Sequence, residues 1–592
     1  MNLRHHFLVL LWINIFFVVA FISPIRAEDK TSKTYSVCPN RVEIIHDSEI
    51  KFSKNEKNFL CGDPNVKAWQ DLPISQIQYH IKTFLETRGF FQTQFKISGQ
   101  ILKVYPGNTI NISEVTLTGN QPDFINIKRR WKTIGTKLTP ASLSELEGWI
   151  KSELNRNGYA CPNLKSHAHV ISGRVEIEID PGPQQNISSI LQESVPGLDV
   201  GSLRRYDTFQ LELPFNSDLL TLTSQEIEND GVLQSTFFTW RCQEDGVELL
   251  QRTHAGKSKQ IRIGFGVDTQ EYIIVRGSWK HHRIGRHGSN LGLSWFASFR
   301  EQLLKLENEW YAFPPLNPWF FKPRLTIQHE WESDFHYLSG DVYFPVARNY
   351  NNQKFSLYYS LGPDFNTTYS FEGADKGITK FLRLQGEAIW TDHYYKIFQN
   401  NPHRGYQVQL KANLSSQKIL SDISTQSFQL DWHYYYNFKK LDPPLLVFGW
   451  RGGLSSTLVS GNESNRDRLP PNYRYYLGGS TNLRGFSRKE LPRNIDDIEV
   501  GALSAAYLSF ELRLANYIPF GIQPIIFFDA GMMGDGFMNF NSPLYYSPGA
   551  GVRVDSPFGV FRTTFAHGFK TGDDNDPGNT HFQFLFSFGE EF

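Results

Sequence analysis

The stretch from His581 to Phe592 reads HFQFLFSFGEEF. Phenylalanine occupies alternate positions from Phe582 to Phe588, with Gln583, Leu585 and Ser587 between them. A period of two with large apolar groups on one face describes a β-strand that meets a hydrophobic medium on one side only. Such a strand at the edge of a soluble sheet invites aggregation, whereas in a membrane barrel its aromatic side chains face lipid. The stretch therefore favours a transmembrane β-barrel over a soluble β-sandwich.

The first 27 residues have the order of a secretory signal peptide. A basic start at Arg4 precedes an uncharged run from Phe7 to Ile22, and Ala27 offers a small residue at the cleavage point. A membrane anchor is the alternative, because this run approaches spanning length, but Pro24 directly after it favours cleavage. We therefore predict an exported chain with residues 1–27 removed.

The composition is consistent with export. Lys plus Arg number 60 and Asp plus Glu number 60, so the chain has no net charge. It lacks the excess of basic residues that is typical of nucleic-acid-binding proteins. Four cysteines in an oxidising compartment suggest disulfides. Cys38 and Cys61 are close in sequence and are predicted to pair, whereas the connectivity of Cys161 and Cys242 stays open. No Cys-x-x-Cys motif or His-rich cluster supports a metal site, and we expect no cofactor.

A structural unit repeats before residue 256. A glycine ends each of two predicted amphipathic helices, 77–87 and 143–157, and a strand and a Pro-Gly turn follow in each copy. Gly89 and Gly158 are 69 residues apart, which indicates tandem modules. Residues 184–256 match the period in length but lack the motif, although 219–229 fit a helix. The prediction is three α+β modules, at 28–108, 109–183 and 184–256, of which the third is the least supported.

From residue 257 onward the pattern is that of hairpins. Apolar and polar residues alternate strictly over 428–436 and 506–514, as a lipid-facing wall around a wet interior requires. Residues 257–592 number 336, and at roughly 20 residues for each strand and its connection they supply about 16 antiparallel strands. The predicted fold is thus a set of α+β modules followed by a transmembrane antiparallel β-barrel.

Two segments in the second half carry a more specific signal. The first, Gly478 to Phe486 (GGSTNLRGF), lies in a long connection between strands, and its Arg-Gly-Phe triplet consists of Arg484, Gly485 and Phe486. The second is Phe527 to Gly531 (FFDAG), in which strand alternation turns Asp529 toward the barrel interior.

These features together resemble the BamA/TamA outer-membrane assembly family. The repeat over residues 35–183 is similar to the POTRA modules of that family, and the triplet is similar to the hallmark of its long sixth extracellular loop. The resemblance implies that this loop folds back into the lumen and that Arg484 pairs with Asp529 there. Within this family, five modules are expected for BamA and two for the two-partner secretion transporters. Three modules therefore resemble the TamA branch.

By resemblance, the function is the assembly and insertion of outer-membrane proteins, autotransporters included. The implied partners are a TamB-like inner-membrane-anchored periplasmic protein, unfolded outer-membrane protein clients and outer-membrane lipid. The barrel would lie in the bacterial outer membrane and the modules in the periplasm. Two-partner secretion and phospholipid transport remain alternatives. No nucleotide loop, Gly-x-Ser-x-Gly or His-Glu-x-x-His motif occurs, so we expect no enzyme activity.

The expected mechanism is a weak barrel seam. The first strand, near 259–267, must pair with the last, 582–588, and Gly264 and Gly266 weaken that pairing. An open seam would offer unpaired backbone groups to a client strand. The terminal aromatic residues are also expected to act as the signal for the protein's own insertion: Phe584, Phe586, Phe588 and Phe592.

Overall fold

The structure is a computed structural model that describes residues 32–39, 41–62, 72–199, 201–314, 317–373, 376–461, 463–492, 501–556, 559–571 and 581–589. The predicted signal peptide and Phe592 lie outside these residues. The chain divides into two compact units. One comprises Met1–Thr116, Thr133–Glu147 and Ser166–Ile177, and the other comprises Leu117–Lys132, Gly148–Lys165 and Glu178–Phe592.

The first module is a four-stranded sheet with two helices. Its strands, in the order β1-β2-β4-β3, are β1 (Lys33–Cys38), β2 (Val42–His46), β4 (Ile101–Tyr105) and β3 (Gln94–Ser98). Its helices are α2 (Lys54–Cys61) and α3 (Ile74–Glu86). The predicted strand 101–105 coincides with β4, and the predicted helix 77–87 overlaps α3.

Local sequence explains both helices. Ser53 caps α2 in a capping box: its Oγ accepts from the Glu56 amide at 3.2 Å, and Glu56 accepts from the Ser53 amide at 2.7 Å. In α3, Ile77, Ile81 and Leu85 recur every four residues, so they share one face and are buried against the sheet.

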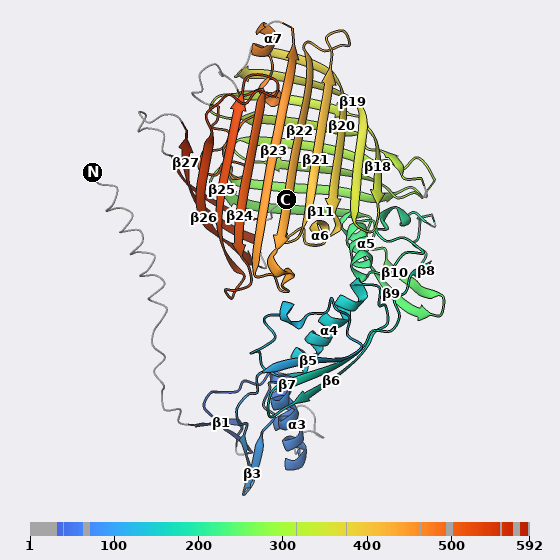
Figure 1. The fold of residues 1–592 in the computed structure, drawn as a ribbon, viewed down its shortest axis with the longest axis vertical. Helices are drawn as coiled ribbons and strands as arrows, with labels where there is room; N and C mark the ends of the chain where they lie inside the picture. Colours follow the sequence, from blue (N-terminus) through green and yellow to red (C-terminus); the bar gives the residue numbers. More distant parts are fainter. Residues whose placement is uncertain are drawn as a thin grey trace, which may run out of the picture. The chain divides into compact units, whose positions relative to one another are not determined.

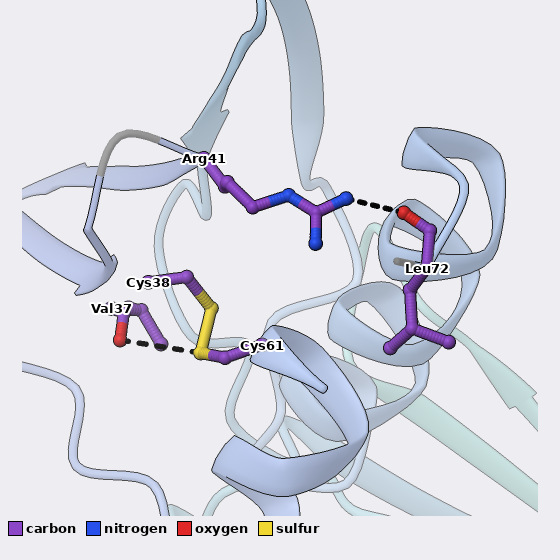
Figure 2. Close-up of a disulfide and its surroundings, with 5 residues drawn as sticks. All are labelled: Val37, Cys38, Arg41, Cys61 and Leu72. Atoms are coloured by element: carbon purple, nitrogen blue, oxygen red, sulfur yellow. Dashed lines mark hydrogen bonds between the residues drawn. A yellow bond between two sulfur atoms is a disulfide. The ribbon is translucent and has the colours of Figure 1, made fainter. Parts of the chain in front are cut away.

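The structure joins Cys38 at the end of β1 to Cys61 at the end of α2 (Figure 2). Beside this disulfide, Arg41 donates to the Leu72 carbonyl oxygen at 2.5 Å. The disulfide therefore ties the outermost strand of the sheet to the first helix.

The second and third modules each hold a three-stranded sheet. The second has the order β5-β7-β6 and contains β5 (Glu114–Gly119), η2 (Ile127–Arg129), α4 (Pro140–Arg156), β6 (Asn163–His169) and β7 (Arg174–Asp180). The third has the order β8-β10-β9 and contains β8 (Ile187–Gln192), η3 (Arg204–Tyr206), α5 (Ser217–Asn229), β9 (Ser235–Gln243) and β10 (Gly246–His254). The helix expected at 219–229 lies within α5. A second disulfide joins Cys161 to Cys242.

The rest of the chain is a closed antiparallel barrel, whose long strands run side by side in Figure 1. Its first nine labelled strands are β11 (Lys259–Asp268), β12 (Tyr272–Ile284), β13 (Ser289–Ala297), β14 (Glu301–Glu309), β15 (Trp319–Phe321), β16 (Arg324–Trp331), β17 (His336–Tyr343), β18 (Val346–Asn351) and β19 (Phe355–Glu372). The remaining nine are β20 (Gly377–Asp392), β21 (Gly405–Ser415), β22 (Ser424–Asn437), β23 (Leu446–Ser460), β24 (Ser504–Leu514), β25 (Ile522–Gly534), β26 (Tyr545–Ser556), β27 (Gly559–Lys570) and β28 (His581–Gly589).

These 18 labelled strands form 16 barrel strands. β15 and β16 are two parts of one strand, separated by Lys322 and Pro323, and β17 and β18 are two parts of the next, separated by Phe344 and Pro345. Proline lacks the amide hydrogen that a ladder needs, so each strand is interrupted at its proline and resumes beyond it. The predicted 16-strand antiparallel barrel preceded by α+β modules is confirmed.

Short helices occur in the connections of the barrel: α6 (His393–Ile397), η4 (Phe438–Lys440), α7 (Glu463–Asp467) and η5 (Pro471–Tyr473). Among the described residues, no helix combines the length and the apolar character that crossing a membrane requires. The strands alternate as the sequence predicts. In β25, for example, Ile526 and Phe528 are 58% and 42% exposed on the outer face, whereas Asp529 is fully buried on the inner face.

Candidate functional site: the lumenal loop and the barrel seam

Arg484 lies in the connection between β23 and β24 and is bound by Asp529 on β25. Two guanidinium nitrogens bind the carboxylate of Asp529: Nε donates to Oδ2 at 2.9 Å and Nη2 donates to Oδ1 at 2.7 Å. The Arg484 amide donates to Oδ2 as well, at 3.0 Å. Both side chains are buried, at 1% and 0% exposed. A bidentate charged pair of this kind fixes direction as well as distance, so it holds the loop in one position.

Further groups on the barrel wall surround the same guanidinium. Its Nη1 donates to Glu511 at 2.9 Å, and its Nη2 donates to the hydroxyl of Ser509 at 3.0 Å. The ring of Phe527 lies beneath it, with 3.5 Å between the guanidinium carbon and the ring centroid. Arg562 on β27 also donates to Glu511, at 2.8 Å. The sequence does not show that these four residues meet Arg484, although strand alternation places Ser509 and Glu511 on the inner face.

Gly485 and Phe486 complete the contact in different ways. A Cβ at Gly485 would lie 2.6 Å from the Gly568 amide nitrogen of β27, so the loop backbone rests directly on the wall. Phe486 is 3% exposed and belongs to a small apolar cluster. Its ring meets Tyr545 edge to face, with the centroids 5.6 Å apart. The triplet therefore contributes a charge, a close backbone contact and an apolar anchor.

The loop keeps its own shape through internal hydrogen bonds. The side-chain oxygen of Asn482 accepts from the amides of Gly478 and Leu483, both at 2.7 Å. The Gly479 amide donates to the Phe486 carbonyl oxygen at 3.0 Å. The segment 478–486 is thus a folded turn that presents Arg484 to the wall.

The described part of the seam between β11 and β28 is short. β11 pairs with β12 along its whole length, from Lys259 opposite His281 to Asp268 opposite Tyr272. Among the described residues it pairs with β28 at only two positions, Val267 with Phe588 and Asp268 with Ser587. The Thr269 amide adds one hydrogen bond, to the Phe586 carbonyl oxygen at 3.0 Å.

This register corrects part of the predicted seam. The strands were expected to pair from Lys259 to Val267, but no described residue of β28 lies opposite 259–265. Gly266 does meet β28, because its Cβ position is 3.1 Å from the Phe588 carbonyl oxygen, whereas no atom of the described residues lies within 4 Å of the Cβ position of Gly264. The register of β28 against β11 could not be predicted from the sequence alone, because the shear of a barrel is not visible in the alternation of one strand.

The phenylalanines of β28 face outward as a set. Phe582 and Phe584 are 65% and 44% exposed, and Phe586 and Phe588 are half-buried. Phe588 stacks on Phe561 of β27 with the ring centroids 4.2 Å apart. Their role as an insertion signal stays a prediction, and its last member, Phe592, lies outside the described residues.

The fold and the site define a class. A 16-strand antiparallel barrel with an arginine-anchored lumenal loop, preceded by small α+β modules, has the architecture of an outer-membrane β-barrel. Residues 397–592 match the model of the Omp85 superfamily domain. This range contains the lumenal loop, Asp529 and β28.

Several solved structures are similar to this chain. BamA from Haemophilus ducreyi lacking POTRA domains 1-3 is 17% identical with a TM-score of 0.48, and the match covers 81% of this chain and 99% of that one. CdiB from Acinetobacter baumannii is 12% identical with a TM-score of 0.43, covering 81% and 90%. BamA POTRA3-5 from Haemophilus influenzae is 12% identical with a TM-score of 0.26, covering 38% and 99%.

Proposed function

We propose that this protein assembles and inserts other outer-membrane proteins, and that a client strand adds to the free edge of β11. The observation that carries the proposal is the two-position seam between β11 and β28. Over residues 259–265 the edge of β11 meets no described residue of β28, and we infer that its backbone donors and acceptors there can pair with another strand.

The side chains of this segment suit the same role. Ile261, Ile263 and Phe265 alternate along β11 and are 66%, 61% and 74% exposed. Their face is the outer, lipid-directed face of the barrel. A client strand that pairs with β11 would therefore bury its backbone groups in the ladder and align its own apolar side chains with these three. Unfolded strands of outer-membrane proteins have this alternation, and that makes them the fitting substrate class.

The periplasmic modules support the TamA branch of the family over its two-module transporters. In the described part of the chain, three small sheets, each with at least one helix, precede the barrel. By resemblance such modules receive clients and bind a TamB-like partner. Two-partner secretion and phospholipid transport are the competing functions, and the experiment below separates them from client insertion.

A disulfide across the seam tests the proposal. Val267 and Phe588 are register partners on the outer face, so cysteines at these two positions are within bridging distance. We expect the oxidised double-cysteine protein, reconstituted in liposomes, to stop accelerating the folding of an unfolded outer-membrane client, and reduction to restore it. Folding of the client is measured as a change in its migration on a denaturing gel when the sample is not heated.

The matched control is a second cysteine pair at Leu304 and Ile327, which links β14 to β16 on the outer face and leaves β11 and the seam unchanged. It should be fully active when oxidised. Full activity of the seam-locked protein would overturn strand addition at β11. Transport of fluorescent phospholipid or export of one dedicated protein that survives the lock would point to the corresponding alternative.

A further inference from the structure

A second basic anchor lies four residues after Arg484, and its partners are carboxylates of different barrel strands. Arg488 donates from Nε to Glu332 at 2.6 Å and from Nη2 to Glu330 at 3.1 Å and to Glu301 at 3.2 Å. Its Nη1 donates to Glu271 in the turn between β11 and β12. One guanidinium thus gathers four carboxylates from the turn 269–271, β14, β16 and the turn that follows β16.

The cluster is buried and its charges are nearly balanced. The side chains of Glu330, Glu332 and Glu271 are 1%, 4% and 7% exposed. Lys489 pairs with Glu330, and Arg300 pairs with Glu332 at 2.6 Å. The four carboxylates therefore meet three cations, and removal of Arg488 would leave two cations to compensate four carboxylates.

The two arginines hold opposite flanks of the seam. The partners of Arg484 lie on β24 and β25, whereas those of Arg488 lie on the wall that begins at β11. In the closed barrel, β26, β27 and β28 stand between β25 and β11, and the seam lies at the last of these boundaries. The loop spans the distance in the few residues from Arg484 to Arg488.

The same loop touches β28 and the turn that follows β11. The hydroxyl of Ser487 accepts from the side-chain nitrogen of Gln583 on β28 at 3.2 Å. The Ser480 amide donates to the side-chain oxygen of Gln270, in the turn after β11, at 3.1 Å.

We propose that residues 479–489 form a lumenal clasp, in which Arg484 holds the C-terminal wall and Arg488 holds the N-terminal wall, so that the loop keeps the seam closed from inside. Arg488 is a positioning residue in this device. The clasp supplies the closure that two register positions of backbone pairing do not, because its ion pairs are shielded from water. Its relation to client insertion rests on the function proposed above, as a means of regulating when the seam opens.

Hydrogen exchange of the full-length protein in lipid nanodiscs tests the clasp without a client. The Thr269 amide is protected by its hydrogen bond across the seam, so its exchange rate reports the open population. In the double substitution Arg488→Gln with Lys489→Gln, we expect exchange in the peptide that contains Thr269 to accelerate by about tenfold or more, since a multiply paired buried charge is lost. A cysteine pair at Val267 and Phe588, when oxidised, should suppress the acceleration.

The matched control is Arg466→Gln, which removes an exposed cation from the same loop and should leave exchange unchanged. The clasp holds only while both arginines are bound, so Arg484→Ala should accelerate exchange at Thr269 as well. Combining it with the Arg488 substitution should add little further acceleration. If the Arg488 and Lys489 variant does not fold, Glu271→Gln removes one carboxylate of the cluster and should give a smaller acceleration.

Unchanged exchange at Thr269 in a folded Arg488 variant, or in a folded Glu271→Gln variant, would overturn the clasp. Acceleration that persists in the oxidised cysteine pair would also overturn it, since the effect would then be loosening of the turn rather than opening of the seam. Neither result bears on strand addition by clients, which the seam-lock experiment tests separately.

Discussion

Gly485 of the lumenal loop and Gly568 of β27 approach so closely that neither position has room for a side chain. A Cβ at Gly485 would lie 2.6 Å from the Gly568 nitrogen, and a Cβ at Gly568 would lie 2.6 Å from the Gly485 carbonyl oxygen. Real Cβ atoms do not approach other atoms to this distance, so an added methyl group must displace the loop. The contact sets how deeply Arg484 reaches toward Asp529.

We therefore expect Gly568→Ala to loosen the loop although it leaves every charged residue in place. Overpacking of this kind costs about 1–3 kcal/mol, which should appear as faster protease cleavage within residues 478–489. Gly340→Ala on β17 is the control, because its Cβ position has only one neighbour within 4 Å, at 3.9 Å. Equal cleavage of the two variants would mean that the loop tolerates the displacement.

Arg484→Ala should leave the barrel folded but release its loop and lower assembly activity. Breaking a buried ion pair by removing one partner costs about 3–5 kcal/mol, because the other charge remains buried without its counterpart. Asp529→Ala should have a similar effect, and the double substitution should be less severe than the sum of the two. Activity of reconstituted protein and heat-dependent gel migration of the barrel are the two measurements.

Arg484→Lys separates charge from geometry in that experiment. Lysine keeps the positive charge but cannot donate two parallel hydrogen bonds to the Asp529 carboxylate. We expect only partial recovery of activity. Full activity in the Ala variants of both positions would contradict a role of the pair in holding the loop.

The fold was accessible from sequence because its signals are local. Strand β4 and helix α5 follow from apolar periodicity within a dozen residues, and alternation alone turns Asp529 toward the lumen. Helix α2 also has a local sequence signal, the capping box of Ser53 and Glu56.

The parts that escaped prediction depend on register between distant strands. The four glutamates around Arg488 are spread from Glu271 to Glu332, and nothing in their spacing shows that one guanidinium meets them all. The two-position seam depends on the shear of the closed barrel. The strands that resume beyond Pro323 and Pro345 are another such case, since proline in a single sequence reads as a strand end.

The disulfide between Cys38 and Cys61 should stabilise the first module by about 2–4 kcal/mol, since it closes a short loop in the unfolded chain. The sequence separation of the two cysteines is 23. Replacing both with serine should lower the stability of this module and leave the barrel unchanged, as read by protease resistance of residues 33–105. Mass mapping of non-reduced protein extracted from the outer membrane that found both thiols free would remove the prediction.

The third module should lose stability as the pH rises toward neutrality. Burial raises the pKa of Asp207 to about 7, although Arg204 donates to its carboxylate at 3.0 Å and opposes the shift. The folded module therefore binds a proton that the unfolded chain releases near pH 4. Linkage then requires the free energy of unfolding contributed by this group to fall between about pH 4 and pH 7 and to level off above that range.

Asp207→Asn imitates the protonated side chain and should remove this dependence. We expect the variant to match the parent near pH 4 and to be more stable than it at pH 8, where the parent holds a buried charge. Hydrogen exchange in β8 and β10, corrected for the intrinsic effect of pH on exchange, measures the difference in the full-length protein. Glu212→Gln, at an exposed position of the same module, is the control and should change nothing at either pH. A variant at position 207 that is less stable than the parent at pH 8 would show that the ion pair with Arg204 outweighs the cost of burying the carboxylate.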